Sequence, residues 1–472
     1  MSAVIERPRT TADVALSEEL LRRFDTPGPR YTSYPTADRF VDSFGPRDAE
    51  LALSRRGESG AADPLSLYVH IPFCESLCYY CACNKVITKH HERAAEYLDV
   101  LEAELALVVG RLGGRSHRVS QLHFGGGSPT FLTDAELQRV VGALGASFTL
   151  LPDIEMSIEV DPRTVTPERL ANLRAMGFNR LSFGVQDFDA EVQRAVHRVQ
   201  PYEDVQGLMD CARALGFRSI NADLIYGLPK QTPDSFARTL EQIGALRPDR
   251  IALYAYAHLP TRFKPQRRIS ASDLPSAGQR VQMLGSAIRS FLARGYDYIG
   301  MDHFALADDS LAVAKREGRL QRNFQGYSTH RDCDLIGLGL SAIGRVGATY
   351  YQNAKALPDY YDAVRKGRLP VVRGVQLTHD DLLRREVIMD LMCQGRLDFA
   401  SIERAHGMRA PRYFASELQQ LSQHAADGLV ELDENGITVT PKGWYLVRAI
   451  AMVFDGHLRN DVRPPGRFSR VV

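Results

Sequence analysis

The chain has 472 residues, of which 44% are hydrophobic and 24% are charged, the composition of an ordinary globular protein. Its 58 basic and 57 acidic residues leave a formal net charge of +1, so no global field attracts nucleic acid or an anionic membrane. No apolar run approaches the length of a membrane span, and residues 1–30 contain no apolar core of signal-peptide length. We therefore expect a cytoplasmic protein with no membrane span and no nucleic-acid partner.

Six short β-rich runs follow one another along the first 256 residues, and each ends in a polar or glycine cluster. The expected strands are 65–71, 121–124, 155–160, 180–183, 220–226 and 250–256. Amphipathic segments between them predict helices over 94–109, 133–144, 167–176 and 233–246. Strands that alternate with helices indicate βα units and parallel strands. Six units suit an α/β fold built on a partial (β/α)6 barrel, whose active site lies at the C-terminal strand ends.

The regions on either side of the barrel have a different pattern. Residues 1–60 look irregular and predict an N-terminal arm that leads into a barrel over 61–300. The βα rhythm weakens after residue 290, so 301–375 is interpreted as a barrel extension. Residues 376–472 form a mostly helical C-terminal domain, with helices expected over 380–393 and 411–426 and a hairpin over 429–439. Helices followed by a hairpin suggest a winged-helix-like module, but the segment is not clearly basic, which favours a lid or packing domain over DNA binding.

A short loop contains four of the seven cysteines. Cys74, Cys78 and Cys81 have the spacing C-x3-C-x2-C, and Cys83 follows two residues later. Four cysteines usually hold a [4Fe–4S] cluster, so three would leave one iron open to a small molecule. The alternative is structural zinc, which usually needs a second pair of ligands far along the chain. No such pair stands out, and an exposed cluster with unpaired thiols requires a reducing compartment.

Other residues that could carry chemistry lie at the ends of the later strands. Residues 125–127 are three consecutive glycines, which bring the backbone close to a ligand. Glu159, Gln186, Arg198 and Asp223 lie on or past later strands and could complete a polar pocket. Each could equally be a turn cap or part of a surface ion pair. His303, after the barrel, could be a proton donor or a structural histidine.

These residues resemble known families at two levels. The cysteine loop, with an aromatic residue before its third cysteine, is similar to the cluster motif of radical S-adenosylmethionine enzymes. Eight motifs in order resemble the oxygen-independent coproporphyrinogen III oxidase (dehydrogenase) family over nearly the whole chain. They are 68–74, 81–85, 158–162, 184–188, 223–229, 256–260, 300–304 and 323–327.

The resemblance implies a reaction and a set of ligands. The family converts two propionates of coproporphyrinogen III to vinyl groups, giving protoporphyrinogen IX in haem biosynthesis, and uses one [4Fe–4S] cluster and two S-adenosylmethionine molecules. By this match the cluster ligands are Cys74, Cys78 and Cys81. The first S-adenosylmethionine would contact Tyr68, Tyr80, Gly126, Glu159, Gln186, Arg198 and Asp223. The second would contact Gly127, Ser128, Ala257, Gln325 and Ile343. Serine stands at position 128 where threonine is usual, which keeps the hydroxyl.

The resemblance does not decide the catalytic residues, the substrate-binding residues or the electron donor. Cys83 and His303 are candidate catalytic residues, and Arg30 and Arg322 are candidates to clamp the substrate's propionates. The expected partners are coproporphyrinogen III and a reducing electron donor such as flavodoxin or ferredoxin, and the expected assembly is a monomer. The haem-chaperone branch of the superfamily lacks both the fourth cysteine and the arm motif at 31–36, which this chain has. A simple iron–sulfur electron carrier would have no need of Glu159, Gln186 and Asp223 around an open iron.

Overall fold

The computed structural model describes residues 18–24, 26–60, 63–114, 117–330, 333–459, 468 and 470. The first 17 residues of the predicted arm, and residues 460–467 of the predicted C-terminal domain, lie outside this part of the chain. One large sheet dominates the described residues. Its twelve strands have the order β16-β15-β14-β13-β1-β4-β5-β6-β7-β8-β10-β9. None of the described helices is long and apolar enough to cross a membrane.

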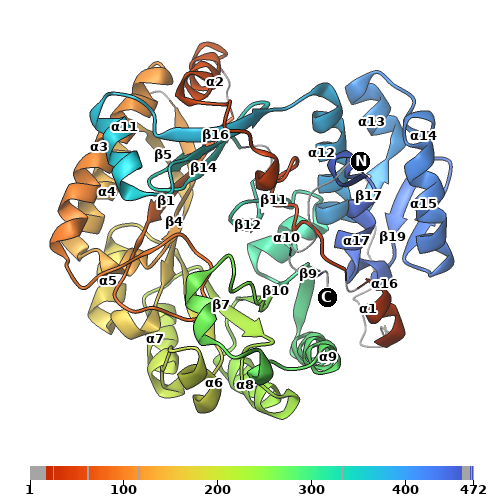
Figure 1. Cartoon of the computed structure of the whole chain (residues 1–472), viewed down its shortest axis with the longest axis horizontal. Helices are drawn as coiled ribbons and strands as arrows, with labels where there is room; N and C mark the ends of the chain where they lie inside the picture. Colours follow the sequence, from red (N-terminus) through yellow and green to blue (C-terminus); the bar gives the residue numbers. More distant parts are fainter. Residues whose placement is uncertain are drawn as a thin grey trace.

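Six parallel strands form the centre of the sheet and confirm the predicted partial barrel. They are β1 (Leu65–Ile71), β4 (Arg118–Gly126), β5 (Thr149–Val160), β6 (Arg180–Gln186), β7 (Ser219–Tyr226) and β8 (Arg250–Ala255). Helices cover the outer face of this arc (Figure 1). They are α3 (Glu92–Arg111), α4 (Asp134–Ser147), α5 (Pro167–Ala175), α6 (Ala190–Ala195), α7 (Tyr202–Ala214), α8 (Pro233–Leu246) and α9 (Ala277–Ala293). The helix over 202–214 was not predicted.

The sheet continues beyond the barrel at both edges, which the sequence did not predict. β13 (Leu335–Leu338) adds in parallel to β1, and β14 (Ile343–Val346), β15 (Thr349–Asn353) and β16 (Val371–Gln376) follow in antiparallel order. At the other edge β10 (His303–Leu306) pairs antiparallel with β8 and with β9 (Tyr296–Gly300). A separate hairpin of β11 (Gln321–Asn323) and β12 (Gly326–Ser328) lies inside the arc (Figure 1).

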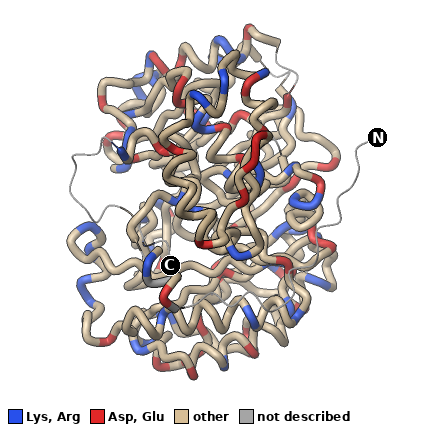
Figure 2. The backbone as a smooth tube through the Cα atoms, turned by 90° about the vertical axis from the view of Figure 1, so that its right-hand side faces the viewer, with Lys and Arg blue, Asp and Glu red and all other residues tan. Residues whose placement is uncertain are grey.

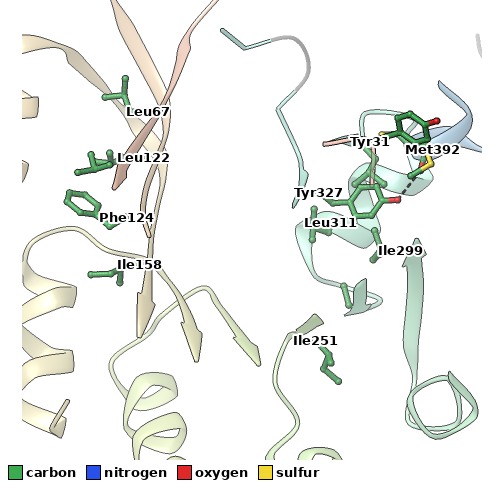
Figure 3. Close-up of a cluster of buried hydrophobic side chains, with 14 of the residues drawn as sticks. Tyr31, Leu67, Leu122, Phe124, Ile158, Ile251, Ile299, Leu311, Tyr327 and Met392 are labelled. Carbon is green, nitrogen blue, oxygen red and sulfur yellow. Dashed lines mark hydrogen bonds between the residues drawn. The ribbon is translucent and has the colours of Figure 1, made fainter. Parts of the chain in front are cut away.

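Alternation along the strands separates an apolar outer face from a polar inner face. Leu67, Leu122, Phe124 and Ile158 are completely buried in the apolar core (Figure 3). The residues between them line a cavity, among them His123 and Ser157. In a closed (β/α)8 barrel, branched apolar side chains fill the lumen. Here polar side chains occupy that position, so the interior of the open barrel is available for a ligand.

The C-terminal domain has the predicted winged-helix-like arrangement. Helix α12 (His379–Gln394) is followed by α13 (Phe399–His406), α14 (Ala410–Tyr413) and α15 (Ala415–Ala426), so the helix expected over 411–426 is interrupted near Phe414. The expected hairpin is β18 (Val430–Leu432) with β19 (Gly436–Val439), and β17 (Arg396–Asp398) adds a third strand. The domain packs on the barrel extension, where the Tyr327 hydroxyl donates to the carbonyl of Met392 at 3.0 Å (Figure 3). This contact fits the interpretation as a packing domain.

The N-terminal arm joins the C-terminal domain to the barrel. Helix α1 (Glu18–Phe24) lies against α15, where Arg23 pairs with Asp427 (Figure 1). Further along the arm, the Tyr31 hydroxyl donates to Asp455 at 3.0 Å. Helix α2 (Pro46–Glu58) then packs beside α3. The chain thus crosses from one domain to the other before the first strand begins.

The remaining elements are short, and charges of both signs are interspersed over the molecule (Figure 2). The short elements are η1 (Ala37–Arg39), β2 (Phe73–Cys74), β3 (Val86–Ile87), η2 (Pro129–Phe131), η3 (Pro162–Thr164), η4 (Lys264–Arg268), η5 (Ala271–Asp273), α10 (Ser310–Arg316), α11 (Leu357–Arg365), α16 (Pro441–Trp444), α17 (Val447–Met452) and α18 (Gly456–Arg459).

Candidate active site

A cavity of about 530 Å³ occupies the open barrel, within the range of small-molecule sites. Most of the predicted site residues line it, although they come from segments up to 250 residues apart. They are Cys74, Cys78, Tyr80, Cys81, Cys83, Gly126, Gly127, Ser128, Glu159, Gln186, Arg198, Asp223, His303 and Gln325.

Three of the predicted cofactor residues do not line this cavity, and neither do Arg30 and Arg322, the predicted propionate ligands. Tyr68 stacks on His123, which lines the cavity, with ring centroids 5.8 Å apart. The carbonyl of Ala257 accepts a hydrogen bond from Gln266 at 3.1 Å. Ile343 packs with Phe324 at a separate small apolar cluster. Their predicted contacts with S-adenosylmethionine remain predictions.

The cysteine loop is held in place by backbone pairing and by polar side chains. Strands β2 and β3 pair in parallel, so Cys74 lies opposite Ile87. The side-chain amide of Asn84 donates to the carbonyl of Lys355 at 3.1 Å, and the side chain of Lys85 donates to the carbonyl of Cys81 at 3.0 Å. The loop therefore keeps its shape by contacts at both ends, as a site that must position several thiols requires.

The surroundings of the thiols favour negative charge on some of them. Arg163 and Arg198 each donate to the Sγ of Cys78 at 3.6 Å. A hydrogen bond from Cys83 lowers the pKa of Cys81 to about 5, against the effect of burial. Burial raises the pKa of the Cys74 thiol to about 12, so this thiol needs a metal to become a thiolate.

The arrangement of these thiols fits a cluster better than a single ion. Among the described residues, no three His, Cys, Asp or Glu side chains surround one ion position. A zinc ion needs its ligands around one point, whereas each cysteine of a [4Fe–4S] cluster binds a different iron. Cys74, Cys78 and Cys81 line one cavity with guanidinium groups behind them, which fits a cluster held by three cysteines.

The three glycines follow β4 at a point where no side chain fits. Gly126 has φ +117°, and a Cβ there would lie 2.6 Å from the ring of His70. A Cβ on Gly127 would lie 2.7 Å from the carbonyl oxygens of Pro72 and Phe73. The turn therefore lies directly against the cysteine loop, and glycine is required for this close approach. A hydrogen bond with Ser128 lowers the pKa of Cys74 slightly against the dominant effect of burial.

Glu159 is a carboxylate fixed at the cavity wall. It accepts from the Gly126 amide at 3.1 Å, and His123 lies 3.5 Å from its other oxygen. Burial disfavours the charge, but the contacts with His123 and Gly126 outweigh burial and lower the pKa of Glu159. Glu159 is therefore ionised at neutral pH and can accept hydrogen bonds from a bound ligand.

Asp223 lies farther along the sheet and has a different environment. It accepts from the Ser182 hydroxyl and from the Asn221 amide, both at 2.9 Å. Burial, followed by repulsion from Glu159, raises its pKa to about 6. The sequence analysis did not identify His123, Ser182 or Asn221. Their two-residue spacing from Gly125, Gly184 and Asp223 along β4, β6 and β7 is the signal that could have indicated them.

Arg198 connects the polar pocket to the cysteine loop. It is buried, donates to the carbonyl of Gly184 at 2.6 Å and pairs with Asp161 at 3.2 Å. Gln186, at the end of the same strand β6, has φ +67°, which is rare for a residue other than glycine. Such backbone strain is typical of functional sites. Asp161 faces the cavity but uses its carboxylate to hold Arg163 and Arg198.

Two arginines lie near His303 on the other side of the cavity but do not line it, and Arg322 borders a small separate cavity. Arg30 pairs with Asp302, and its guanidinium lies 5.2 Å from the ring of Tyr254. Arg322 donates to the carbonyl of Arg30 at 3.2 Å. Within the described structure, no hydrogen-bond partner reaches Nη1 of Arg322, Nδ1 of His303 or Nε2 of Gln325.

Burial, together with Arg322 and Arg30, lowers the pKa of His303 well below its usual value. The imidazole is therefore neutral at physiological pH. It can form hydrogen bonds with a ligand, but it does not carry the extra proton of a charged acid. Two arginines beside one aspartate leave an excess of positive charge here, which favours an anionic ligand.

The fold and the site together define a class of protein, the radical S-adenosylmethionine enzymes. The defining features are a three-cysteine loop at the mouth of a partial (β/α)6 barrel, a glycine turn that faces the loop, and polar residues at the strand ends. The family model described as Radical SAM superfamily matches residues 68–243, and that of the HemN C-terminal domain matches residues 377–446. The chain belongs to the oxygen-independent coproporphyrinogen III oxidase family.

The relatives that establish this membership match nearly end to end. The oxygen-independent coproporphyrinogen III oxidase of Pseudomonas aeruginosa is 52% identical over 456 residues, which cover 96% of this chain and 98% of that protein. The Escherichia coli protein of the same name is 50% identical over 453 residues, covering 96% and 98%. The solved structure of E. coli HemN, described as a radical SAM enzyme, superposes with a TM-score of 0.87 at 50% identity and covers 91% of this chain and 97% of that one.

Proposed function

We propose that this protein converts coproporphyrinogen III to protoporphyrinogen IX without oxygen, by oxidative decarboxylation of two propionate side chains to vinyl groups. The observation that carries the proposal is the composition of the cavity in the open barrel. Three cluster cysteines and the polar residues Glu159, Arg198 and Asp223 line it on one side. His303 and Gln325, whose buried donors lack partners among the described residues, line it on the other.

The cluster and its cofactor would occupy the side of the cysteine loop. When bound, they supply a carbon radical that can remove a hydrogen atom from the carbon next to the porphyrinogen ring. Each propionate would then lose that hydrogen atom to the carbon radical, one carbon dioxide, and one electron that passes to an electron acceptor, and a vinyl group remains. Cys74, Cys78 and Cys81 would hold the cluster, leaving one iron open. Glu159 and Asp223 would hold hydroxyl groups of the S-adenosylmethionine ribose, because both line the cavity with carboxylate oxygens that can accept hydrogen bonds.

A second S-adenosylmethionine molecule belongs to the proposal. The cavity continues past the first pocket to Asn323, Gln325 and Tyr327. Nε2 of Gln325 is buried and lacks a partner among the described residues, and an unsatisfied buried donor costs about 1–3 kcal/mol. A ligand atom that accepts from Gln325 would remove this cost. Gly127 and Ser128 line the same cavity from the cysteine side.

Arg30 and Arg322 would hold propionates of the substrate. Coproporphyrinogen III carries four carboxylates, and a guanidinium binds a carboxylate through two parallel hydrogen bonds. The His303 imidazole, neutral in this environment, would donate or accept one further hydrogen bond. The barrel walls and the C-terminal domain would limit access of water to the reacting carbon.

The enzyme would also need an electron donor and a reducing compartment. A small electron carrier such as a flavodoxin or ferredoxin would reduce the cluster, and the protein would act as a monomer in the cytoplasm. All seven cysteines are free thiols, which is consistent with a reducing compartment.

Anaerobic turnover of the purified protein tests the proposal. The protein is loaded with iron and sulfide, reduced, and mixed with S-adenosylmethionine and coproporphyrinogen III. The expected products are protoporphyrinogen IX, two molecules of carbon dioxide per substrate, and 5′-deoxyadenosine. A haem chaperone would bind haem and give no protoporphyrinogen, and an electron carrier would give no 5′-deoxyadenosine, so either result would replace the proposal.

A further inference from the structure

The outer face of the cysteine loop is covered by two surface segments. On one side, the Tyr79 amide donates to the carbonyl of Val196 at 3.0 Å, and the ring of Tyr79 stacks on His197 at 5.1 Å. On the other side, Gln266 of η4 donates to the carbonyl of Tyr80 at 3.0 Å. Tyr79 and Tyr80, which make these contacts, stand in the sequence between the cluster cysteines Cys78 and Cys81.

The segment that carries η4 is strongly basic. It contains four exposed cations, here called the basic rim: Arg262, Lys264, Arg267 and Arg268. The sequence has no acidic residue between Asp249 and Asp273, and Asp273 already pairs with Lys230 at 2.6 Å. No carboxylate of the described residues forms an ion pair with any member of the basic rim. This is unusual in a chain with almost balanced charges, because unpaired like charges in one segment repel each other.

The basic rim is rigidly connected to the cysteine loop. Arg268 donates to the Tyr79 hydroxyl at 3.2 Å and lies 5.2 Å from the centre of its ring. Beneath the rim, Tyr79 and Tyr80 pack on a small apolar cluster that includes Val192 and Ile269. The positive field at this face is therefore held at a fixed position relative to the cluster cysteines.

An exposed apolar side chain follows two residues after His197, which stacks on Tyr79. Val199 is 59% exposed, one of few large hydrophobic side chains so exposed in the described structure. It follows Arg198, which donates to Cys78. Protein interfaces commonly combine an apolar centre with a charged rim. A small apolar patch beside unpaired cations is suited to a partner of opposite charge.

We propose that the basic rim, together with Tyr79 and Val199, is the docking surface for a small acidic protein that carries one electron. The inference rests on the proposed function, because the chemistry there consumes electrons delivered from outside. In the step, one electron leaves the reduced carrier and enters the cluster, and no bond or proton is exchanged. The rim attracts the acidic carrier and orients it with its redox group toward the loop that contains Cys78 and Cys81.

Charge reversal at the rim tests this surface. The variant is Lys264→Glu/Arg267→Glu, because neither side chain contacts the cysteine loop. The probe is a flavodoxin, an acidic flavin protein. At low salt, the second-order rate of cluster reduction by reduced flavodoxin should fall about tenfold or more, and its dependence on salt should flatten. Binding of oxidised flavodoxin, measured by surface plasmon resonance, should weaken in parallel.

Two controls separate docking from other effects. Arg404→Glu/Arg412→Glu makes the same charge change at exposed cations of the C-terminal domain. Flavodoxin should reduce the cluster of this variant at the wild-type rate. Photoreduced deazaflavin, a small neutral reductant, should reduce both variants as fast as the wild type. In the neutral variant Lys264→Gln/Arg267→Gln, the rate of cluster reduction by flavodoxin should lie between the rates of the wild type and the charge-reversal variant.

Several results would overturn the inference. Unchanged reduction by flavodoxin in the rim variant would do so, and so would an equal loss in both charge-reversal variants. A higher KM for coproporphyrinogen III with deazaflavin as the reductant would instead assign the rim to the anionic substrate. Failure of the wild type to form protoporphyrinogen would remove the proposed function, while reduction of its cluster by flavodoxin would still measure docking.

Discussion

The guanidinium of Arg198 lies 3.6 Å from the Sγ of Cys78, although the two residues are 120 positions apart in the chain. Arg198 is held in this position by Asp161 and by the carbonyl of Gly184. The cysteine loop and the end of β6 are therefore connected through Arg198. Because a cation near a thiolate stabilises its charge, Arg198 supports a cluster ligand and is more than a wall of the cofactor pocket.

Replacing Cys74, Cys78 or Cys81 by serine should abolish the cluster. Each thiolate binds a separate iron, so none can substitute for another. Iron and sulfide content and visible absorbance measure the loss. Cys333→Ser is the matched control, because Cys333 lies outside the loop and should retain the cluster. A loop variant with full iron content would contradict the assignment.

Glu159→Ala and Asp223→Ala should keep the cluster but bind S-adenosylmethionine more weakly. A hydrogen bond to a charged group contributes roughly 1.5–3 kcal/mol, or about ten- to a hundredfold in affinity. Equilibrium binding to the reconstituted protein measures the change. Glu159→Gln and Asp223→Asn keep the shape of each side chain and should lose less. If all four variants bind S-adenosylmethionine as tightly as the wild type, Glu159 and Asp223 are only strand-end caps.

Cys83→Ser should keep the cluster and strongly reduce protoporphyrinogen formation. Cys83 lines the cavity beside Cys81 and is not needed as a ligand if one iron stays open. Cluster absorbance and product are measured under anaerobic conditions, with Cys211→Ser as the control. Near-normal product would leave only a packing role for Cys83. Loss of the cluster would make it a ligand and remove the open iron.

Arg322→Gln should raise the KM for coproporphyrinogen III about tenfold or more, because a propionate would lose a charged hydrogen-bond donor. The affinity for S-adenosylmethionine should not change. Steady-state kinetics and binding measurements separate the two effects. Arg316→Gln removes an arginine that pairs with Asp297 at the surface and should have no effect. An unchanged KM would exclude Arg322 from the substrate site.

Glu104→Gln should change the pH dependence of stability. Glu104 is completely buried and accepts from the Tyr360 hydroxyl and the Asn353 amide, both at 2.6 Å. Burial raises its pKa to about 7, above its usual value of 4.5. The folded state therefore holds this proton more tightly than the unfolded state. The stability from Glu104 is complete below pH 4.5 and is lost as the pH rises to 7, by on the order of 3 kcal/mol.

The glutamine variant has no proton to lose at this position, so its unfolding free energy should decline less between pH 5 and pH 8. Urea unfolding at several pH values measures the difference. If the wild type and the variant change in parallel with pH, Glu104 does not titrate in this range.

The sequence by itself determined the features that depend on neighbours in the chain. The spacing of Cys74, Cys78 and Cys81 sets which thiols one loop can present. The two-residue alternation of strands and the longer period of helices predicted six βα units and their polar ends, because these periods follow from backbone geometry. The hairpin at the C-terminus followed from Asn435-Gly436, which suits a tight turn.

Only the tertiary structure decided which distant residues meet. Arg322 lies against the carbonyl of Arg30, 292 residues earlier, and His123 lies between Tyr68 and Glu159. The strands added at both sheet edges were likewise absent from the prediction, because short segments such as β13 and β10 become strands only by pairing, β13 in parallel with β1 and β10 antiparallel to β8. Local pattern fixes the backbone of a segment, but its partners depend on packing and burial across the whole fold.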